Sequence, residues 1–268
     1  MSGAVQQPIQ IGAVSYLNAR PLTRALDREP GRWHVRYDVP SVCATLLHSG
    51  RVDLGLIPSI EYLEGDDYRF VPGVAIGSRG PVASVALYTT RDVSDIRRIA
   101  LDSSSRTSVA LVKVLCTHRF HTAPEFVPHG PDLRAMLETC DAGLLIGDPA
   151  LDVDQQAMGL RKIDLGAEWT TMTGLPFVYA AWTGRPGAID ASGITALQDA
   201  RTEGVSAIDA IASEYARGNE AVRRRAVSYL RDNVRYGFGP EEAQGLQLFL
   251  DHAAGLGLAA RRREIAFF

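Results

Sequence analysis

Short apolar runs alternate with segments of helical spacing along this chain, and that alternation limits the fold more than any other feature. Two runs show it best, residues 52–58 (VDLGLIP) and residues 142–149 (AGLLIGDP). Each combines an aspartate and small residues with a compact apolar strand that ends in proline, which is typical of strands buried in a sheet. The chain is therefore predicted to have an α/β fold.

The strand-and-helix pattern starts a second time after residues 89–91, which indicates two lobes. With 268 residues, 46% of them hydrophobic, the chain can bury a sizeable core. We expect it to cross between the lobes at residues 89–91 and again at residues 182–184. One lobe would then contain residues 1–90 and 184–268, and the other residues 91–183. Two crossing strands form a hinge, and the cleft between hinged lobes is the natural place for a ligand.

The composition argues against several classes of protein. A formal net charge of −3 and a pI near 6.1 do not suit a general nucleic-acid binder. The three cysteines, Cys43, Cys116 and Cys140, are widely spaced, which fits buried thiols in a reducing compartment better than disulfides. No run approaches the roughly 20 apolar residues of a membrane span. Because residues 1–12 also lack the features of an export signal, we expect a soluble, cytoplasmic protein.

Nucleotide-binding and metal-binding motifs are not recognisable in the sequence. There is no Walker A loop, no complete G-x-G-x-x-G after a strand and no H-E-x-x-H. His118 and His121 could share one face of a helix, but two histidines at this spacing do not by themselves match a known metal-binding motif. We therefore expect neither a cofactor nor a metal.

The first candidate site follows the first predicted strand, residues 9–14. This strand runs directly into four polar side chains, Ser15, Tyr16, Asn18 and Arg20. In open α/β sheets, ligands bind beyond the carboxyl ends of strands, where the next helix presents free N–H groups. A hydroxyl, a phenol, an amide and a guanidinium at this point suit a small polar anion.

The second candidate site joins a predicted strand at residues 99–101 to an apolar helix at residues 109–115. Its polar side chains include Ser103, Ser105, Arg106 and Thr107. One hydroxyl should cap the helix, but capping leaves the other hydroxyls and the guanidinium without a structural role. We therefore favour an anion site here over capping alone.

Other candidates are less specific. Ser84 lies in an apolar run and faces either the cleft or the core, and Ser59 follows a strand end. Gly147 and Asp148 follow the second strand described above, where Asp148 fits a cap or a turn better than a catalytic role. Residues 169–174 are expected to form a loop that could line the cleft.

Three segments resemble the chorismate dehydratases of menaquinone biosynthesis: residues 14–22 (VSYLNARPL), residues 50–59 (GRVDLGLIPS), and Trp169 with residues 173–178 (TGLPFV). The resemblance extends through nearly the whole chain. It implies a two-lobed fold like that of type II periplasmic solute-binding proteins, with a hinge and an interlobe cleft, in a cytoplasmic enzyme of the futalosine route. A sister enzyme, the dihydroxynaphthoate synthase, usually carries S-x-C-P-N-D-T after its first strand, so the sequence here favours the dehydratase.

The activity that this resemblance implies is the loss of water from chorismate to give 3-[(1-carboxyvinyl)oxy]benzoate. Since chorismate is a dicarboxylate, Arg20 and Arg106 are expected to bind its carboxylates. No Asp, Glu or His lies among residues 15–20 to act as a base. We expect Asn18 to orient the reacting hydroxyl or proton, Ser84 to assist the departing hydroxyl, and the substrate's own side-chain carboxylate to be a candidate proton acceptor. The residues expected to bind substrate are Ser15, Tyr16, Arg20, Ser59, Ser103, Ser105, Arg106, Thr107, Gly147 and Asp148.

Two alternatives stay open at this point. One is the sister synthase, and the other is a solute-binding protein that captures an organic anion without chemistry, which the fold alone does not distinguish from an enzyme. The lack of an export signal favours the enzyme, whereas the oligomeric state is not indicated. All of these expectations require the turn that carries Asn18 and the serine-rich turn, residues 103–108, to face each other across a shared gap.

Overall fold

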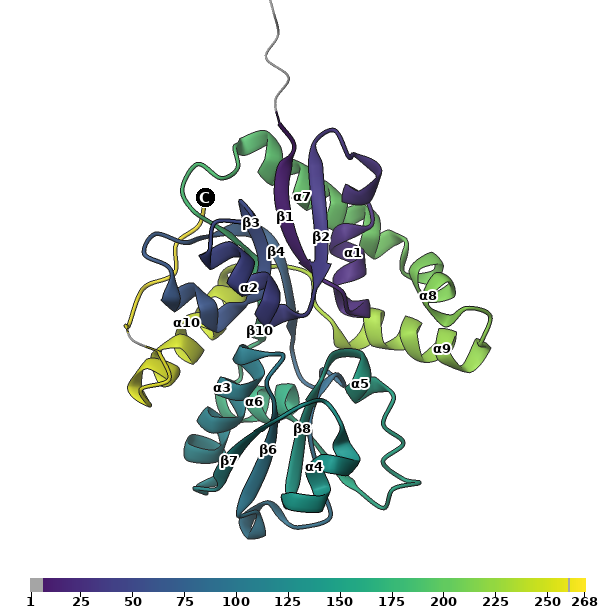
Figure 1. The fold of residues 1–268 in the computed structure, drawn as a ribbon, viewed down its shortest axis with the longest axis vertical. Helices are drawn as coiled ribbons and strands as arrows, with labels where there is room; N and C mark the ends of the chain where they lie inside the picture. Colours follow the sequence, from purple (N-terminus) through teal and green to yellow (C-terminus); the bar gives the residue numbers. More distant parts are fainter. Residues whose placement is uncertain (1–6, 260) are drawn as a thin grey trace, which may run out of the picture.

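Two five-stranded sheets form the centres of two lobes, one above the other in the computed structural model (Figure 1). The structure describes residues 7–259 and 261–268. The first sheet has the order β2-β1-β3-β10-β4, with β1 (Ile9–Val14), β2 (Trp33–Asp38), β3 (Leu54–Pro58), β4 (Arg69–Ser78) and β10 (Phe177–Gly184). Strand β1 runs parallel to β2 and β3, and β10 runs antiparallel to β3 and β4.

The second sheet has the order β7-β6-β8-β5-β9. Its strands are β5 (Val85–Thr89), β6 (Arg98–Asp102), β7 (Glu125–His129), β8 (Ala142–Ile146) and β9 (Arg161–Asp164). Strand β6 is parallel to β7 and β8, and β5 is antiparallel to β8 and β9. The predicted α/β class is confirmed.

The two crossings between the lobes differ from the predicted ones. Strand β5 pairs with β8 and β9, so it belongs to the second lobe, and β10 pairs with β3 and β4, so it belongs to the first. The chain therefore crosses within residues 79–84 and 174–176, and the boundaries expected near residues 90 and 184 are displaced. Both crossings contain glycine and proline, which interrupt strands, whereas β5 and β10 are buried along their whole length.

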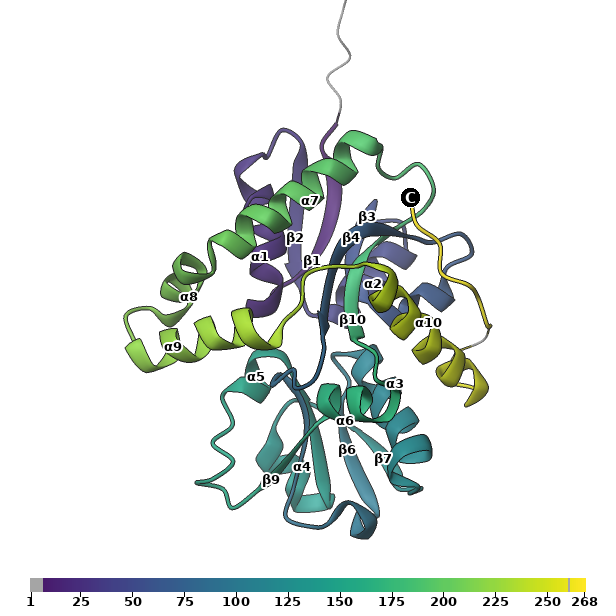
Figure 2. The ribbon, with the colours of Figure 1, turned by 180° about the vertical axis from the view of Figure 1, so that it is seen from behind.

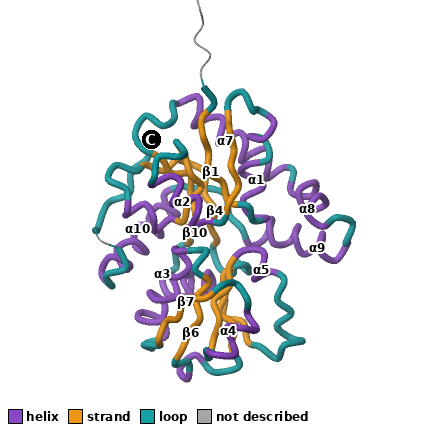
Figure 3. The backbone as a smooth tube through the Cα atoms, in the orientation of Figure 1, coloured by secondary structure: helices purple, strands orange, loops and turns teal. Residues whose placement is uncertain are grey.

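Helices cover the outer faces of both sheets (Figures 2 and 3). The first lobe has α1 (Arg20–Thr23), α2 (Pro40–His48), α7 (Ala191–Ser206), α8 (Ile208–Ala216), α9 (Glu220–Ser228) and α10 (Pro240–Gly255). The second has α3 (Arg106–Leu115), α4 (Leu133–Thr139), α5 (Gly147–Leu151) and α6 (Leu165–Thr173). Figure 2 shows α7, α8 and α9 following one another along one side of the first lobe. Among the described residues, no helix is long and apolar enough to cross a membrane.

Helix α6 corrects the prediction that residues 169–174 form a loop along the cleft. Asp164 caps this helix by accepting hydrogen bonds from the N–H groups of its first turn. Trp169 is fully buried, and its ring makes edge contacts with Phe177 of β10 and Phe249 of α10. Aromatic packing therefore joins α6 to the first lobe near the second crossing.

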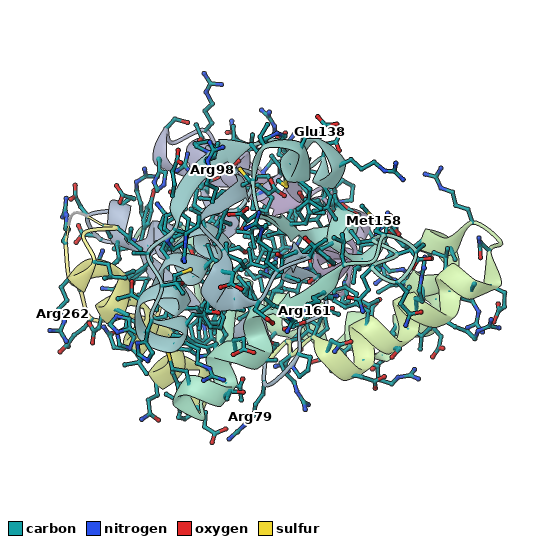
Figure 4. The ribbon with its side chains drawn as sticks, turned by 90° about the horizontal axis from the view of Figure 1, so that it is seen from below. Arg79, Arg98, Glu138, Met158, Arg161 and Arg262 are labelled. Atoms are coloured by element: carbon teal, nitrogen blue, oxygen red, sulfur yellow. The ribbon has the colours of Figure 1, made fainter. Side chains whose placement is uncertain are left out.

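The three cysteines are free and buried, as predicted. On the surface, Arg79 and Arg262 extend from the edge of the molecule in Figure 4. Each is paired with a carboxylate: Arg79 Nη1 lies 2.6 Å from Glu241 Oε2, and Arg262 Nε lies 2.7 Å from Asp251 Oδ1. These surface charges are therefore balanced locally.

Candidate functional site

A small cavity lies between the two lobes, where the ends of β1, β5 and β8 meet the start of α3. Its volume is about 40 Å³, and its polar lining comes from both lobes: Tyr16, Asn18, Ser84, Ser105, Ser108 and Tyr179. The turn that carries Asn18 and the serine-rich turn therefore do face each other across a shared gap. This was the arrangement that the sequence argument required.

Asn18 lies in a 3-10 turn, Leu17–Ala19, which directly follows β1 and Tyr16. Its Oδ1 atom is buried and has no hydrogen-bond partner among the described residues. Burying a carbonyl oxygen without a hydrogen-bond donor costs free energy. This acceptor is therefore available to a ligand in the cavity.

Ser84 is held at the cavity by the strained turn before it. Ala83 has a φ of +66°, in the left-handed region that alanine rarely adopts. The Asp164 carboxylate accepts hydrogen bonds from the N–H groups of Val82 (3.0 Å) and Ala83 (2.7 Å), and Lys162 Nζ donates to the Ala83 carbonyl oxygen (2.6 Å). Because Asp164 also caps α6, one carboxylate fixes both the first crossing and the helix that precedes the second.

Two buried phenols near the cavity were not found by sequence reasoning. Tyr229 donates a hydrogen bond to Ser84 Oγ at 2.8 Å, and Tyr179 Oη lies 3.0 Å from Ser78 Oγ. Burial raises the pKa of both phenols, so both keep their protons at neutral pH. Tyr229 begins a π-helical turn after the charged helix α9, and no local sequence pattern marks it as a site residue.

The serine-rich turn both caps α3 and contacts the other lobe. Ser105 is the N-cap of α3: its Oγ accepts from the Ser108 N–H at 3.4 Å and lies 3.0 Å from Ser108 Oγ. Both side chains line the cavity. Ser104 contacts the other lobe, with its Oγ 3.4 Å from Tyr16 Oη and its carbonyl oxygen accepting from the Ser41 N–H.

Ser59 and Thr107, expected to bind substrate, are fully buried beside the cavity and do not line it. Ser59 Oγ donates to the Val178 carbonyl oxygen at 2.7 Å. Thr107 Oγ1 accepts from the Ile60 N–H at 3.2 Å and lies 3.4 Å from Ser59 Oγ. In this closed arrangement both hydroxyls connect α3 to the first lobe.

Arg106 and Ser103 do not line the interlobe cavity. Both line a larger hollow of about 1000 Å³ beside it. There Arg106 Nη1 donates to Glu61 Oε2 at 2.8 Å, and His48 Nε2 lies 2.6 Å from the same oxygen. Glu61 comes from the other lobe and is almost completely buried, so it already occupies the guanidinium that was expected to bind a carboxylate.

Arg20 and Ser15 line a third pocket, of about 300 Å³, on the outer side of β1. Both are exposed, and the Arg20 guanidinium lies 5.8 Å from the centre of the Tyr215 ring. The two arginines proposed from sequence as carboxylate ligands are therefore separate from each other and from the cavity in this structure.

Gly147 and Asp148 lie where the lobes touch. Gly147 has a φ of +63°, and a Cβ atom there would lie 2.7 Å from the Tyr16 ring. Its N–H donates to the Ser84 carbonyl oxygen at 2.8 Å. Asp148 Oδ1 accepts from the Leu17 N–H at 3.0 Å, and burial raises the pKa of this carboxyl above its ordinary value. Both residues thus take part in the contact between the lobes.

The cavity is much smaller than the roughly 300–1,000 Å³ of typical small-molecule sites. A substrate of chorismate size must therefore enter after the lobes separate about the two crossings. Among residues 7–259 and 261–268, no three His, Cys, Asp or Glu side chains are grouped to hold a metal ion. The arrangement offers hydroxyl and phenol donors and an amide acceptor.

Several solved structures share the fold at low sequence identity. A protein from Archaeoglobus fulgidus superimposes with a TM-score of 0.75 at 20% identity, covering 95% of this chain and 100% of that one. The alkanesulfonate-binding protein of Xanthomonas axonopodis pv. citri, solved with MOPS bound, gives 0.70 at 15% identity and covers 98% of each chain. The expected two-lobed periplasmic-binding-protein fold is therefore confirmed.

Curated relatives are closer in sequence. A chorismate dehydratase of Thermus thermophilus is 31% identical over 274 residues, covering 94% of this chain and 97% of the relative. A chorismate dehydratase of Campylobacter jejuni is 29% identical over 178 residues, covering 64% of this chain and 66% of the relative. Residues 9–255 match the protein family described as menaquinone biosynthesis. The chain therefore belongs to this menaquinone-biosynthesis family.

Proposed function

We propose that the protein is a chorismate dehydratase, a carbon–oxygen lyase that converts chorismate to 3-[(1-carboxyvinyl)oxy]benzoate and water. The observation that carries the proposal is the interlobe cavity lined by Asn18, Ser84 and the capped turn of α3. The full-length similarity to a chorismate dehydratase supports the same substrate. The buried free thiols support a cytoplasmic location, where reducing conditions preserve them.

The reaction needs a proton to leave one ring carbon and a hydroxyl to leave its neighbour. The proton is on the carbon that carries the ether oxygen, and the ring carboxylate activates it through the conjugated double bond. Its removal gives an extended dienolate, and the electron pair then expels the neighbouring hydroxyl as the ring becomes aromatic. The acceptor returns its proton to the departing oxygen, so the net product is water.

The cavity side chains fit this sequence of events. The Asn18 carbonyl oxygen would accept a hydrogen bond from the reacting hydroxyl and fix its direction, while the substrate's side-chain carboxylate removes the ring proton. Ser84 would donate to the departing oxygen. The hydroxyls of Ser105 and Ser108, with the N-terminus of α3, would stabilise a carboxylate whose charge grows in the transition state.

We propose that the two arginines contribute less to carboxylate binding than the sequence suggested. Tyr16, Ser105, Gly147 and the α3 N-terminus lie at the cavity, whereas Arg20 and Arg106 line neighbouring pockets. The arginines would attract the dianionic substrate to the open cleft, since unlike charges interact over several ångströms.

The test is to incubate the purified protein with chorismate, without added metal or nucleotide, and to follow the aromatic product by absorbance and mass. Asn18→Ala should lower kcat by about 100-fold or more and change KM much less, because the amide acts on the reacting group. Asn219→Ala is the matched control: Asn219 caps α9 on the surface, and its loss should leave kcat unchanged. No product from the wild-type protein, together with tight binding of another organic anion, would replace the lyase with a binding protein.

A further inference from the structure

We propose that Tyr229 is a positioning residue that acts through Ser84, by holding the serine hydroxyl so that its own hydrogen faces the substrate. The inference rests on the proposed dehydration and adds a residue from the C-terminal helices to it. Tyr229 lies 145 positions beyond Ser84 in the sequence, and the fold brings the two hydroxyls to 2.8 Å.

Tyr229 is buried, although it also borders a pocket of about 540 Å³ that residues of both lobes line. Tyr229 is 4% exposed, and Ser84 is 1% exposed. It begins the π-helical turn Tyr229–Asn233, which widens the backbone after α9, and such turns often occur at functional sites. The packing of the C-terminal helices therefore fixes the buried phenol beside Ser84, and Asn18 is another polar side chain close to it.

The direction of this hydrogen bond decides what Ser84 can do. Tyr229 donates and Ser84 Oγ accepts, so the serine's own hydrogen is not used by this contact. Among the described residues, Ser84 Oγ makes no other hydrogen bond in the structure. Because Ser84 lines the cavity, that hydrogen is left for a group bound there, which in the proposed reaction is the departing hydroxyl.

Tyr229 keeps its proton throughout. Burial raises the pKa of its phenol well above the ordinary value, and the opposing effects of Ser84 and Asn18 are smaller. A neutral phenol remains a donor across the range in which enzymes are assayed. Without it, Ser84 Oγ loses its only donor and is free to turn its hydrogen toward a backbone carbonyl, as strand serines do.

A double-mutant cycle tests the proposal with Tyr229→Phe, Ser84→Ala and the combined variant. Tyr229→Phe keeps the ring and removes only the hydroxyl, so it should lower kcat by about 10- to 100-fold with little change in KM. In the Ser84→Ala background the same change should cost less than about twofold, because the serine that Tyr229 positions is already absent. The control is Tyr236→Phe, which removes another buried phenol hydroxyl, one without a partner among the described residues, and should leave kcat unchanged.

The results of these measurements separate the inference about Tyr229 from the proposed function. Equal kcat in Tyr229→Phe and the wild type overturns the inference and leaves the dehydratase intact. Losses that add in the double variant show that Tyr229 does not act through Ser84, and they also overturn it. A matched fall in kcat and in thermal stability that Tyr236→Phe reproduces would reduce the effect to packing. Failure of the wild-type protein to convert chorismate would overturn the proposed function first, and this inference with it.

Discussion

Replacing Gly147 with alanine should hold the two lobes apart without unfolding either one. Gly147 belongs to the second lobe and Tyr16 to the first, and the added Cβ atom would lie 2.7 Å from the Tyr16 ring. Ordinary carbon contacts begin near 3.4 Å. The methyl group therefore overlaps the ring by several tenths of an ångström whenever the lobes are closed, and opening removes the overlap.

Two costs must be separated to predict the size of the effect. An L-residue in the left-handed conformation costs about 1–2 kcal/mol in either state of the lobes. Forcing extra volume into a packed contact costs about 1–3 kcal/mol, and only the closed state bears that cost. Since 1.4 kcal/mol corresponds to a factor of ten, the closure equilibrium should fall by about 5- to 140-fold.

Gly159→Ala supplies the matched control. Gly159 has nearly the same backbone angle, with a φ of +62°, but nothing lies within 4 Å of the position of its Cβ atom. Both variants should therefore lose unfolding stability by thermal melting, while Gly147→Ala alone should lose kcat/KM for chorismate and show a larger radius in X-ray scattering with product bound. If the two variants have the same kcat/KM, closure against Tyr16 is not needed and the reasoning is refuted.

Two further predictions concern buried ionisable groups. Because burial raises the pKa of Asp148 in the folded, closed protein, its ionised form opposes that state at neutral pH, and the cost disappears as the pH falls below the ordinary aspartate pKa of about 4. Asp148→Asn should therefore melt at a higher temperature than the wild type at pH 7 and at the same temperature near pH 3.5; a lower melting temperature at pH 7 would contradict this. Burial also raises the pKa of Cys43 to about 12 and that of Cys116 to about 11, so a thiol reagent at pH 8 should label the folded protein slowly and the unfolded protein quickly. Rapid labelling of either thiol in the folded protein would show that it is accessible.

The class of fold was predictable because buried strands bounded by glycine and proline have a strong local signature. Strand β8 begins and ends where the apolar run does, and β3 ends at its proline. The assignment of strands to sheets was not predictable. Strands β5 and β10 are apolar on both faces, so their sequences do not indicate a preferred neighbour; the turns before them decide it. Strand β9 was missed because its four residues include two cations and an aspartate.

The site was predicted in part for a similar reason. Asn18 and Ser105 were found because turns after strands and before helices have recognisable polar residues. The roles expected of Arg20 and Arg106 depended on where long side chains end, and the partner of Arg106 is Glu61 in the other lobe. No local sequence pattern marks Tyr229, because its proposed role depends on a contact with Ser84, a residue far away in the sequence.

The position of β10 reverses the usual order in which a nascent chain acquires structure. Strand β10 lies between β3 and β4, so the first sheet stays divided until residue 184 has left the ribosome. All five strands of the second sheet lie between residues 85 and 164, so they are available earlier. Two backbone hydrogen bonds, from the Phe70 N–H to the Ala266 carbonyl oxygen and from the Phe268 N–H to the Phe70 carbonyl oxygen, are added to the edge of the first sheet later still. The second lobe can therefore become native while β1, β2 and β3 still lack β10, their link to β4. During synthesis those strands are the part of the molecule most exposed to chaperones and to mispairing.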